Sequence, residues 1–297
     1  MQLSYQTFLA GLFTVLFLHA QAQDKPAYRL YDSKGKKVKY EKMIGQLEKA
    51  DILLFGELHD NPIAHWLQLE VTTELAKKRS LMLGAEMIEA DNQKVLNDYL
   101  IDSISSKELD SLVKLWPNYK TDYKPLVDFA KDNELAFIAT NVPRRYAKLV
   151  YKGRIEGLDT LKGGFEALDT LSDEEKSWIA PLPIDFDPEI KTYKDILEMM
   201  GEHGTPEIVK AQALKDATMS HFILTNYKTG DLFIHYNGAF HSDEYEGILW
   251  HMKRINDKPN YMTISTVSQE SIDALEEENI GKADFIICVD SDMTLTY

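Results

Sequence analysis

Short apolar runs recur along the chain and alternate with longer stretches of helical pattern. Runs of this length, rich in Leu, Ile, Val and Phe, are typical of buried parallel strands. Because strands and helices alternate, the pattern predicts the α/β class, with a mostly parallel central sheet flanked by helices. The predicted strands are residues 51–55, 81–85, 135–139, 232–235, 261–267 and 285–289.

A helix start follows the first predicted strand. Asn61 has the side chain of an N-cap, and Pro62 suits the first helical position, so we expect a helix that extends to about Arg79. The same kind of pattern predicts further helices over residues 143–151 and 247–254, and a polar surface lead-in over residues 23–49.

Two stretches break the alternation. Residues 90–133 and 155–228 have helical pattern with no strand between, and residues 178–188 form an irregular, proline-rich connector. We interpret the two insertions as a helical lid subdomain that covers one edge of the sheet. No repeat or low-complexity tract divides the chain, so we expect a single domain over residues 23–297.

The first residues are interpreted as a secretion signal. Residues 8–18 are apolar but too few to span a bilayer, and Ala20-Gln21-Ala22 gives signal peptidase an Ala-x-Ala site. We therefore expect cleavage of residues 1–22 after Ala22 and a periplasmic or extracellular protein. No cysteine follows the apolar run, so we expect no lipoprotein anchor. No later run is long enough for a membrane span.

Charge and cysteine content narrow the partners. The 33 Lys and Arg residues against 48 Asp and Glu residues give a formal net charge of −15. This balance argues against nucleic acid or an anionic membrane surface as the main partner, since both require a basic face. Cys288 is the single cysteine, so no intramolecular disulfide and no cysteine-based zinc or iron–sulfur site is expected.

Polar side chains follow the predicted strands directly. Glu57 and His59 come after the first strand, Glu86 after the second and His241 after the fourth. The carboxyl ends of parallel strands meet at one edge of the sheet, which we call the rim, so we expect these four residues in one crevice. Further candidates for the crevice are Asn141 and Arg144 after the third strand, His65 in the first turns of the helix after Pro62, and Gln212 and Asp216 on one helical face.

The residue types at the rim suit metal binding. Neutral imidazole and carboxylate bind Zn, Mn, Co or Fe, so Glu57, His59, Glu86 and His241 form a candidate site for a divalent metal ion. Glu57 or Glu86 would then be the catalytic base that activates a metal-bound water. The sequence has no serine nucleophile elbow, no GxGxxG loop and no P-loop, which argues against Ser-His-Asp chemistry and nucleotide binding.

Taken in order, these motifs resemble those of the ChaN family, within the haem-binding uptake and Tiki superfamily. The resemblance covers about residues 45–255. The matching segments are Gly56-Glu57-Leu58-His59-Asp60-Asn61-Pro62 with His65 and Gln68, Glu86-Met87, Tyr123-x-Pro125-Leu126, Asn141-Val142-Pro143-Arg144, His203-Gly204, the run from Ala211 to Met219, and Asn237-Gly238-x-x-His241.

The resemblance implies two different activities. ChaN-like proteins are linked to iron acquisition, with tyrosine as the type of iron ligand and a homodimer that sandwiches haems. Tyr123 would then be the first tyrosine to test as ligand, and Arg144 would pair with a propionate. The same implication places His65, Asn141, His203 and Asp216 around the cofactor. The Tiki relatives are metal-dependent proteases with two Gly-x-x-His motifs and a glutamate, and an esterase group has a related glutamate–histidine site.

Three functions therefore stay open on the sequence. The first is a haem-binding protein for iron uptake. The second is a metal-dependent peptidase or esterase acting on a peptide or small-molecule ligand. The third is a binding module whose rim groups are remnants of an enzyme. The absence of a CxxCH motif argues against covalently attached haem.

Overall fold

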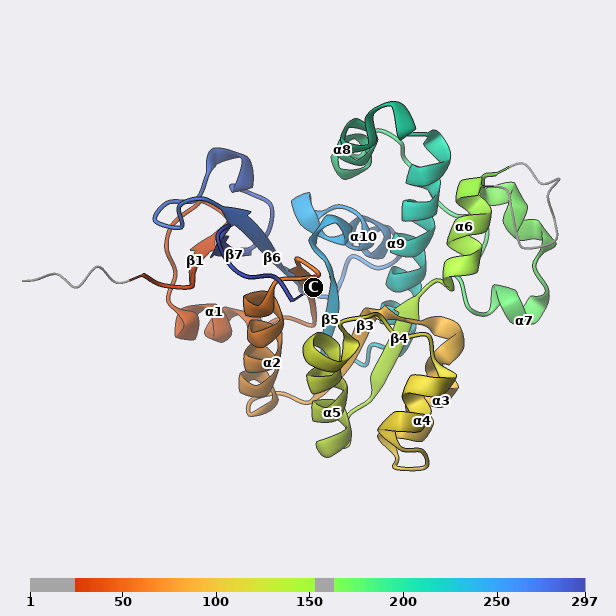
Figure 1. Ribbon diagram of the computed structural model, residues 1–297, viewed down its shortest axis with the longest axis horizontal. Helices are drawn as coiled ribbons and strands as arrows, with labels where there is room; N and C mark the ends of the chain where they lie inside the picture. The colour runs from red at the N-terminus through yellow and green to blue at the C-terminus, as the bar shows by residue number, and fades with distance from the viewer. Residues whose placement is uncertain (1–24, 153–162, 297) are drawn as a thin grey trace, which may run out of the picture.

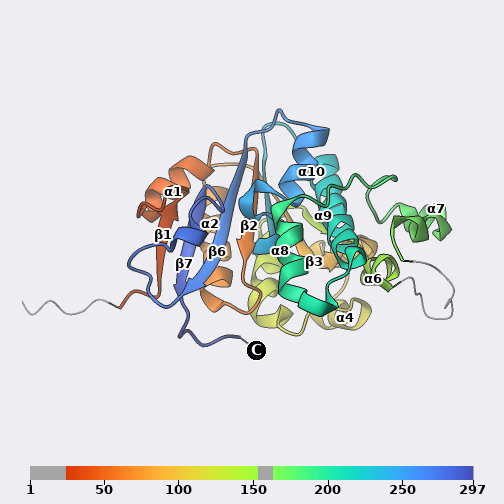
Figure 2. The same cartoon turned by 90° about the horizontal axis from the view of Figure 1, so that it is seen from above.

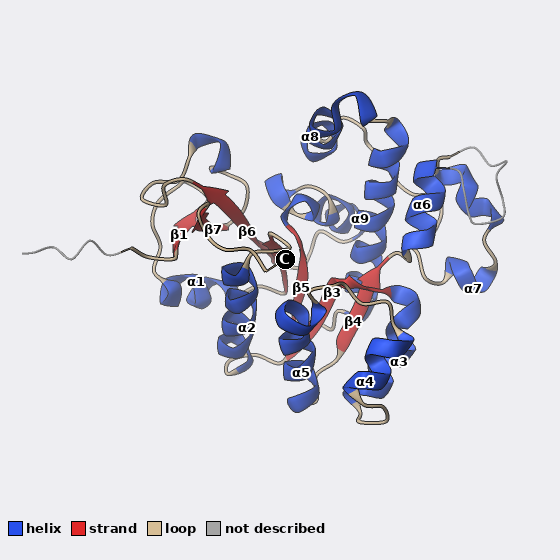
Figure 3. Cartoon of the chain, viewed as in Figure 1, coloured by secondary structure: helices blue, strands red, loops and turns tan. Residues whose placement is uncertain are grey.

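The computed structural model describes residues 25–152 and 163–296 and has a seven-stranded sheet between helical layers (Figures 1 and 3). The strand order is β1-β7-β6-β2-β5-β3-β4. The predicted α/β class is confirmed, whereas the predicted signal peptide, residues 1–22, lies outside the described residues. Within the described ranges, no helix combines the length and apolarity that crossing a membrane requires.

The elements have the following bounds. The strands are β1 (Tyr28–Asp32), β2 (Ile52–Glu57), β3 (Leu81–Glu89), β4 (Phe137–Asn141), β5 (Leu232–Gly238), β6 (Tyr261–Gln269) and β7 (Phe285–Asp290). The helices are α1 (Tyr40–Leu47), α2 (Pro62–Ala76), α3 (Gln93–Leu100), α4 (Ser106–Leu112), α5 (Lys124–Asp132), α6 (Arg144–Lys152), α7 (Asp173–Lys176), α8 (Lys191–Met200), α9 (Pro206–Asn226) and α10 (Ile248–Ile255).

Strands β2 to β7 pair in parallel, and β1 pairs antiparallel with β7 at one edge. The sequence predicted a polar lead-in over residues 23–49, which instead contains β1 and α1. Strand β1 was not predicted because an edge strand is only partly buried and lacks a continuous apolar run. Its five residues include Arg29 and Asp32, and only Leu30 and Tyr31 are buried.

Two helical layers cover the sheet (Figure 2). On one face, α1, α2 and α5 pack against Leu53 and Phe55. On the other face, α9 and α10 pack against Ile52 and Leu54. Every residue of β2 is therefore buried, and a strand buried on both faces appears in sequence as a continuous apolar run. Full burial of each Leu, Ile or Phe side chain of β2 contributes about 1.5–3 kcal/mol to the stability of the fold.

The predicted start of α2 is confirmed. The Asn61 side chain accepts hydrogen bonds at 3.0 Å from the backbone N–H groups of Ile63 and Ala64, and Pro62 occupies the first turn. These bonds satisfy two of the donors that a helix leaves unpaired at its N-terminus. The cap fixes where the chain turns from β2 into α2, and so it also fixes the loop that carries His59.

The two helical insertions lie on different faces of the sheet. Helices α3, α4 and α5, from the first insertion, join the layer that contains α1 and α2. From the second insertion, α9 covers the opposite face and shares a smaller core with α6. The described helices of the two insertions thus do not cover one sheet edge together: α3, α4 and α5 pack on one face and α9 on the other, because the sheet has an apolar surface on both sides.

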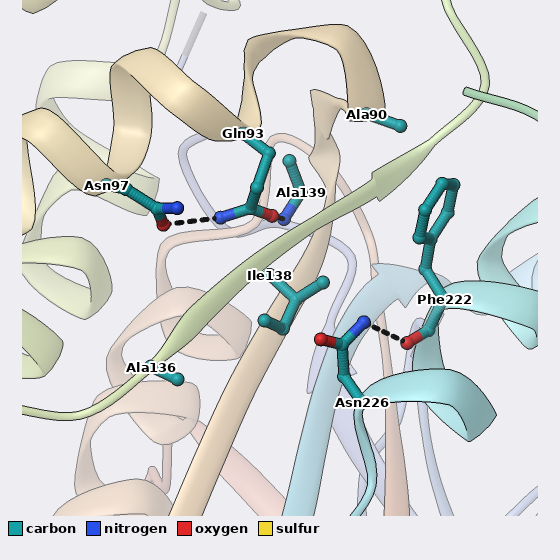
Figure 4. Close-up of a pocket in the computed structure, with 8 residues that line it drawn as sticks. All are labelled: Ala90, Gln93, Asn97, Ala136, Ile138, Ala139, Phe222 and Asn226. Carbon is teal, nitrogen blue, oxygen red and sulfur yellow. Dashed lines mark hydrogen bonds between the residues drawn. The ribbon is translucent and has the colours of Figure 1, made fainter. Parts of the chain in front are cut away.

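Both edges of the sheet are closed by local structure. Residues 36–38 fold back onto β1, where the Val38 N–H donates to the Leu30 carbonyl at 2.8 Å. At the other edge, the Gln93 side chain donates to the Phe137 carbonyl at 3.0 Å and accepts from the Ala139 N–H at 2.7 Å. This amide makes the two hydrogen bonds that a residue of a neighbouring parallel strand would make. Figure 4 shows it beside a cavity of about 430 Å³.

We predict that Gln93→Ala lowers stability by about 1–2 kcal/mol and promotes self-association, because it leaves two backbone groups of an edge strand unpaired. Thermal unfolding and light scattering at rising concentration measure the two effects. Lys94→Ala, at an exposed position one residue further along α3, is the matched control. Unchanged melting and scattering for Gln93→Ala would show that the edge needs no cap.

Candidate functional site

The rim brings together Glu57, His59, Glu86 and His241. Strand β5 lies between β2 and β3, and Glu57 at the end of β2 pairs with Gly238 at the end of β5. Glu86 lies inside β3, which is longer than predicted, at an irregularity in the β3–β4 register. Such irregularities re-aim side chains, and here the carboxylate turns toward β5: Glu86 Oε2 accepts from the Gly238 N–H at 2.8 Å.

Glu57 is fully buried and is surrounded by hydrogen-bond donors. Tyr123 Oη donates to its Oε1 at 2.7 Å, and Gln68 Nε2 donates to its Oε2 at 2.6 Å. His59 Nδ1 lies 2.9 Å from Oε1, and His65 Nδ1 lies 3.3 Å from Oε2. Both oxygens are therefore engaged on more than one side, as a buried charge requires.

Burial and charge act in opposite directions on these pKa values. Burial opposes ionisation of Glu57, but hydrogen bonds and charge interactions with His59 and His65 outweigh it and lower the pKa of Glu57. For His65, burial lowers the pKa, yet Glu57 and Asp122 together raise it to about 9. The pKa of His59 is also raised, by Glu57 and by the charge of Glu86. At neutral pH Glu57 is therefore ionised and His65 is protonated.

Glu86 belongs to a second cluster, in which His241 bridges two carboxylates. His241 Nε2 lies 3.2 Å from Glu86 Oε1, and its Nδ1 contacts Asp216 Oδ1. Tyr193 from α8 donates to the other Asp216 oxygen at 2.9 Å, and Gln212 Nε2 lies 3.0 Å from the imidazole. Burial would lower the pKa of His241, but Glu86 and Asp216 raise it to about 9; the same ion pair holds the pKa of Glu86 far below its usual range.

The two clusters meet at Gly238. A Cβ at this position would lie 2.7 Å from His59 Cε1 and 2.8 Å from its Nε2, so the ring occupies the space that the glycine leaves free. His59 is also the accessible member of the rim: its side chain is 38% exposed, whereas those of Glu57, Glu86 and His241 are buried. The edge of Trp116 packs against the ring at 4.9 Å between centroids. A ligand arriving from solvent would meet His59 first.

The other predicted site residues are placed as follows. Tyr123 is buried in a π-helical turn, Tyr119–Tyr123. Asn141 ends β4 and its buried Oδ1 has no hydrogen-bond partner among the described residues, and Arg144 is exposed at the start of α6. Asp216 faces the rim, as predicted with Gln212. His203 is exposed in a short turn after α8, and Met199 and Met200 are exposed there as well.

The rim residues do not fit a metal ion as they are arranged. No group of three His, Cys, Asp or Glu side chains among residues 25–152 and 163–296 is placed to hold one. The donors already serve one another: Glu57 and Glu86 accept protein hydrogen bonds, and both ring nitrogens of His241 face carboxylates.

Sequence reasoning assigned no role to several residues that hold the site. Tyr193 lies in an insertion whose motifs mark other residues, and nothing in its local sequence indicates that its hydroxyl meets Asp216. Asn118 donates to Asp122, four residues away, at 2.7 Å, and to the His59 carbonyl, across a long sequence separation, at 2.8 Å. Gln68 does stand in the motif, three residues from His65 on α2. The three-residue spacing between His65 and Gln68 on one helix is the sequence signal from which its role could be predicted.

Comparison with known proteins places this fold and rim in a recognised class. The sequence profile of the family described as "Haem-binding uptake, Tiki superfamily, ChaN" matches residues 43–252. The chain belongs to this family, as the motif resemblance implied. The solved structure described as "Cofacial heme binding to ChaN of Campylobacter jejuni" is similar with a TM-score of 0.62 and 18% identity, over 89% of this chain and 97% of that one. At this identity the likeness concerns the fold.

A plant protein is also similar over part of its length. Protein RETICULATA-RELATED 5, chloroplastic, from Arabidopsis thaliana is 31% identical over 133 residues. The match covers 42% of this chain and 18% of the plant protein, so this chain spans under a fifth of that relative.

We predict that stability falls as the pH rises through about 9. Folding raises the pKa of His65 and His241 from an ordinary 6.5 to about 9, so the stabilisation is complete below pH 6.5 and is lost as each histidine deprotonates. Unfolding in urea at pH 7 and pH 10 should differ by on the order of 1–3 kcal/mol. His65→Gln should flatten this difference, whereas replacement of the exposed His203 by Gln should preserve it.

We predict that Gly238→Ala displaces the His59 ring and leaves the fold intact. The backbone of Gly238 has a φ of −59°, which any residue adopts, so the clash is confined to the ring. The pKa of His59, followed by NMR titration, should fall because the contact with Glu57 is lost. Gly45→Ala in α1, where a Cβ has open space, is the control. An unshifted His59 titration in Gly238→Ala would contradict the packing described for the two clusters.

Proposed function

We propose that this protein binds haem at the rim and serves iron uptake outside the cytoplasm. Membership of a family described by haem-binding uptake carries the proposal. The expected secretion signal and the homodimer implied by the resemblance belong to the same proposal. Bound haem supplies a redox-active iron with a characteristic visible spectrum.

The exposed part of the rim suits a flat apolar ligand with anionic groups. The imidazole of His59 is accessible, and the aromatic edge of Trp116 packs beside it. Phe240, next to His241, is a large aromatic side chain that is 45% exposed. Arg144 at the start of α6 is an exposed cation that suits a propionate. These side chains support haem at the rim, with Asn141 beside the propionate region.

Tyr123 remains the proposed iron ligand, but its present contact must break first. Its hydroxyl is buried and donates to Glu57, and burial together with that carboxylate raises the pKa of the phenol far above its usual range. A phenolate ligand requires the opposite shift, which a cationic iron would supply. Haem binding through Tyr123 therefore requires movement of the turn that carries it, while His65 and Asp216 stay buried and hold the ion pairs.

We predict that the protein develops a Soret band on titration with haem, and that Tyr123→Phe shifts the band and weakens binding roughly ten-fold or more, because the oxygen ligand is removed. Tyr119→Phe is the matched control: Tyr119 lies on the same turn, and its buried hydroxyl makes no hydrogen bond with the part of the chain that the structure describes. Size-exclusion chromatography with and without haem tests the dimer. Absence of a Soret change in the wild-type protein would overturn haem binding.

A second function, hydrolysis of an ester or peptide, is favoured by the paired imidazoles. His59 is accessible and its Nδ1 is held by Glu57, so its neutral form would take a proton from an attacking water through Nε2 and pass it to the leaving group. His241, buried between two carboxylates that engage both of its ring nitrogens, would stay protonated and hold Glu86 and Asp216 in place beside the reacting group. The two histidines would thus have different roles because their exposure differs.

We predict that any such activity has a bell-shaped pH dependence. The rate rises as His59 loses its proton, at a pKa raised above 6.5, and falls as His241 loses its own at about 9. A screen of nitrophenyl esters and fluorogenic peptides measures the rate. His59→Gln should lower it about 100-fold or more, whereas His221→Gln on α9 should leave it unchanged. Retained activity in His59→Gln, or no substrate turned over, would overturn this function.

A further inference from the structure

The segment that follows β7, residues 291–296, returns to the site. Thr296 donates its backbone N–H to the Asp60 carbonyl at 2.9 Å, and its hydroxyl lies 2.9 Å from Asp122 Oδ2 and 3.2 Å from the same Asp60 carbonyl. Asp60 is the residue after His59, and Asp122 is the residue before Tyr123. A single threonine therefore joins the loop that carries one rim residue to the turn that carries another.

Thr296 contacts the turn that carries Tyr123. Residues 119–123 form a π-helical turn, a rare geometry that is frequent at functional sites. Asp122 is buried, and its Oδ2 also accepts from Asn118 Nδ2 at 2.7 Å and lies 3.5 Å from His65 Nε2. Every group that fixes this carboxylate therefore also fixes the position of Tyr123.

The segment itself is held weakly. Five of its six residues are exposed, and Met293 is partly buried. Beyond Thr296, its side-chain contacts are an exposed ion pair between Asp292 and Lys25 at 2.8 Å and a 4.0 Å contact of Met293 with Asn61. Exposed ion pairs contribute about 0–1 kcal/mol. A segment with so little buried area opens locally while the rest of the domain stays folded.

We propose that residues 291–296 are a latch, in which Thr296 positions the Tyr119–Tyr123 turn and keeps Tyr123 against Glu57 until the segment detaches. The inference rests on the proposed haem function for its purpose, because Tyr123 must leave Glu57 to meet iron. With the latch closed, the phenol is held by a buried carboxylate. With the latch open, Asp122 loses one of its donors, and the loop that carries Asp60 is joined to the turn through Asn118 without the help of Thr296. Thr296 is thus a positioning residue and contacts no ligand.

The experiment measures the turn directly. In Thr296→Val the hydroxyl bonds to Asp122 and Asp60 are lost, so hydrogen exchange at the amides of Thr121 and Asp122, which donate to the Asn118 carbonyl, should accelerate roughly ten-fold. Thr296→Ser keeps the hydroxyl and should exchange like the wild type. Thr294→Val, an exposed threonine in the same segment with no hydrogen bond described for its side chain, is the matched control. Unchanged exchange in Thr296→Val would overturn the latch.

A second measurement separates the latch from the haem proposal. Stopped-flow mixing with haem should show faster association for Thr296→Val than for the wild type, by about the factor seen in exchange, because the competent open state is more populated. If the wild-type protein binds no haem while Thr296→Val still exchanges faster, the latch stands and the haem function fails. If haem binds but exchange and association are unchanged in Thr296→Val, the haem function stands and the latch fails.

Discussion

Glu57 is a buried carboxylate at the end of a central strand, and the groups around it must supply the hydrogen bonds and positive charge that stabilise its ionised form. The matching groups come from three places in the chain: the loop after β2, helix α2 and the Tyr119–Tyr123 turn. An uncompensated buried charge costs several kcal/mol, so the contacts with Glu57 hold these three elements in place relative to one another. The positions of His59 and Tyr123 follow from this requirement.

Much of the rim could be predicted from the sequence because it depends on local rules. An apolar run followed by a glycine and charged residues places Glu57 and His59 at a strand end, and parallel pairing then fixes which strand ends lie together. The four-residue spacing of Gln212 and Asp216 predicted that both face the rim, because residues four apart share one helical face. The rest could not be predicted because it has no local signature in the sequence. Strand β1 is only half-buried, and Tyr193 contacts Asp216 from another helix. The face of the sheet that each insertion covers is decided by tertiary packing.

The two rim clusters have the same chemistry and different access. In both, neighbouring carboxylates raise the pKa of an imidazole, but His241 is enclosed by α9 and by β3, while the side chain of His59 is partly exposed. Tyr193 also links the buried cluster to α8, whose first backbone N–H groups are bound by Glu246. A displacement of α8 would therefore change the contacts around His241 but not those of His59. A ligand that moves this helix would alter the buried cluster.

The closure of both sheet edges has a consequence for assembly. Residues 36–38 occupy one edge and Gln93 the other. Two copies that keep these caps have no free strand through which their sheets could merge, so contact between copies is left to helical surfaces or to the rim itself. If contact is made at the rim, a ligand bound there becomes part of the interface. Ligand affinity and protein concentration would then be thermodynamically linked, and dilution alone would release the ligand.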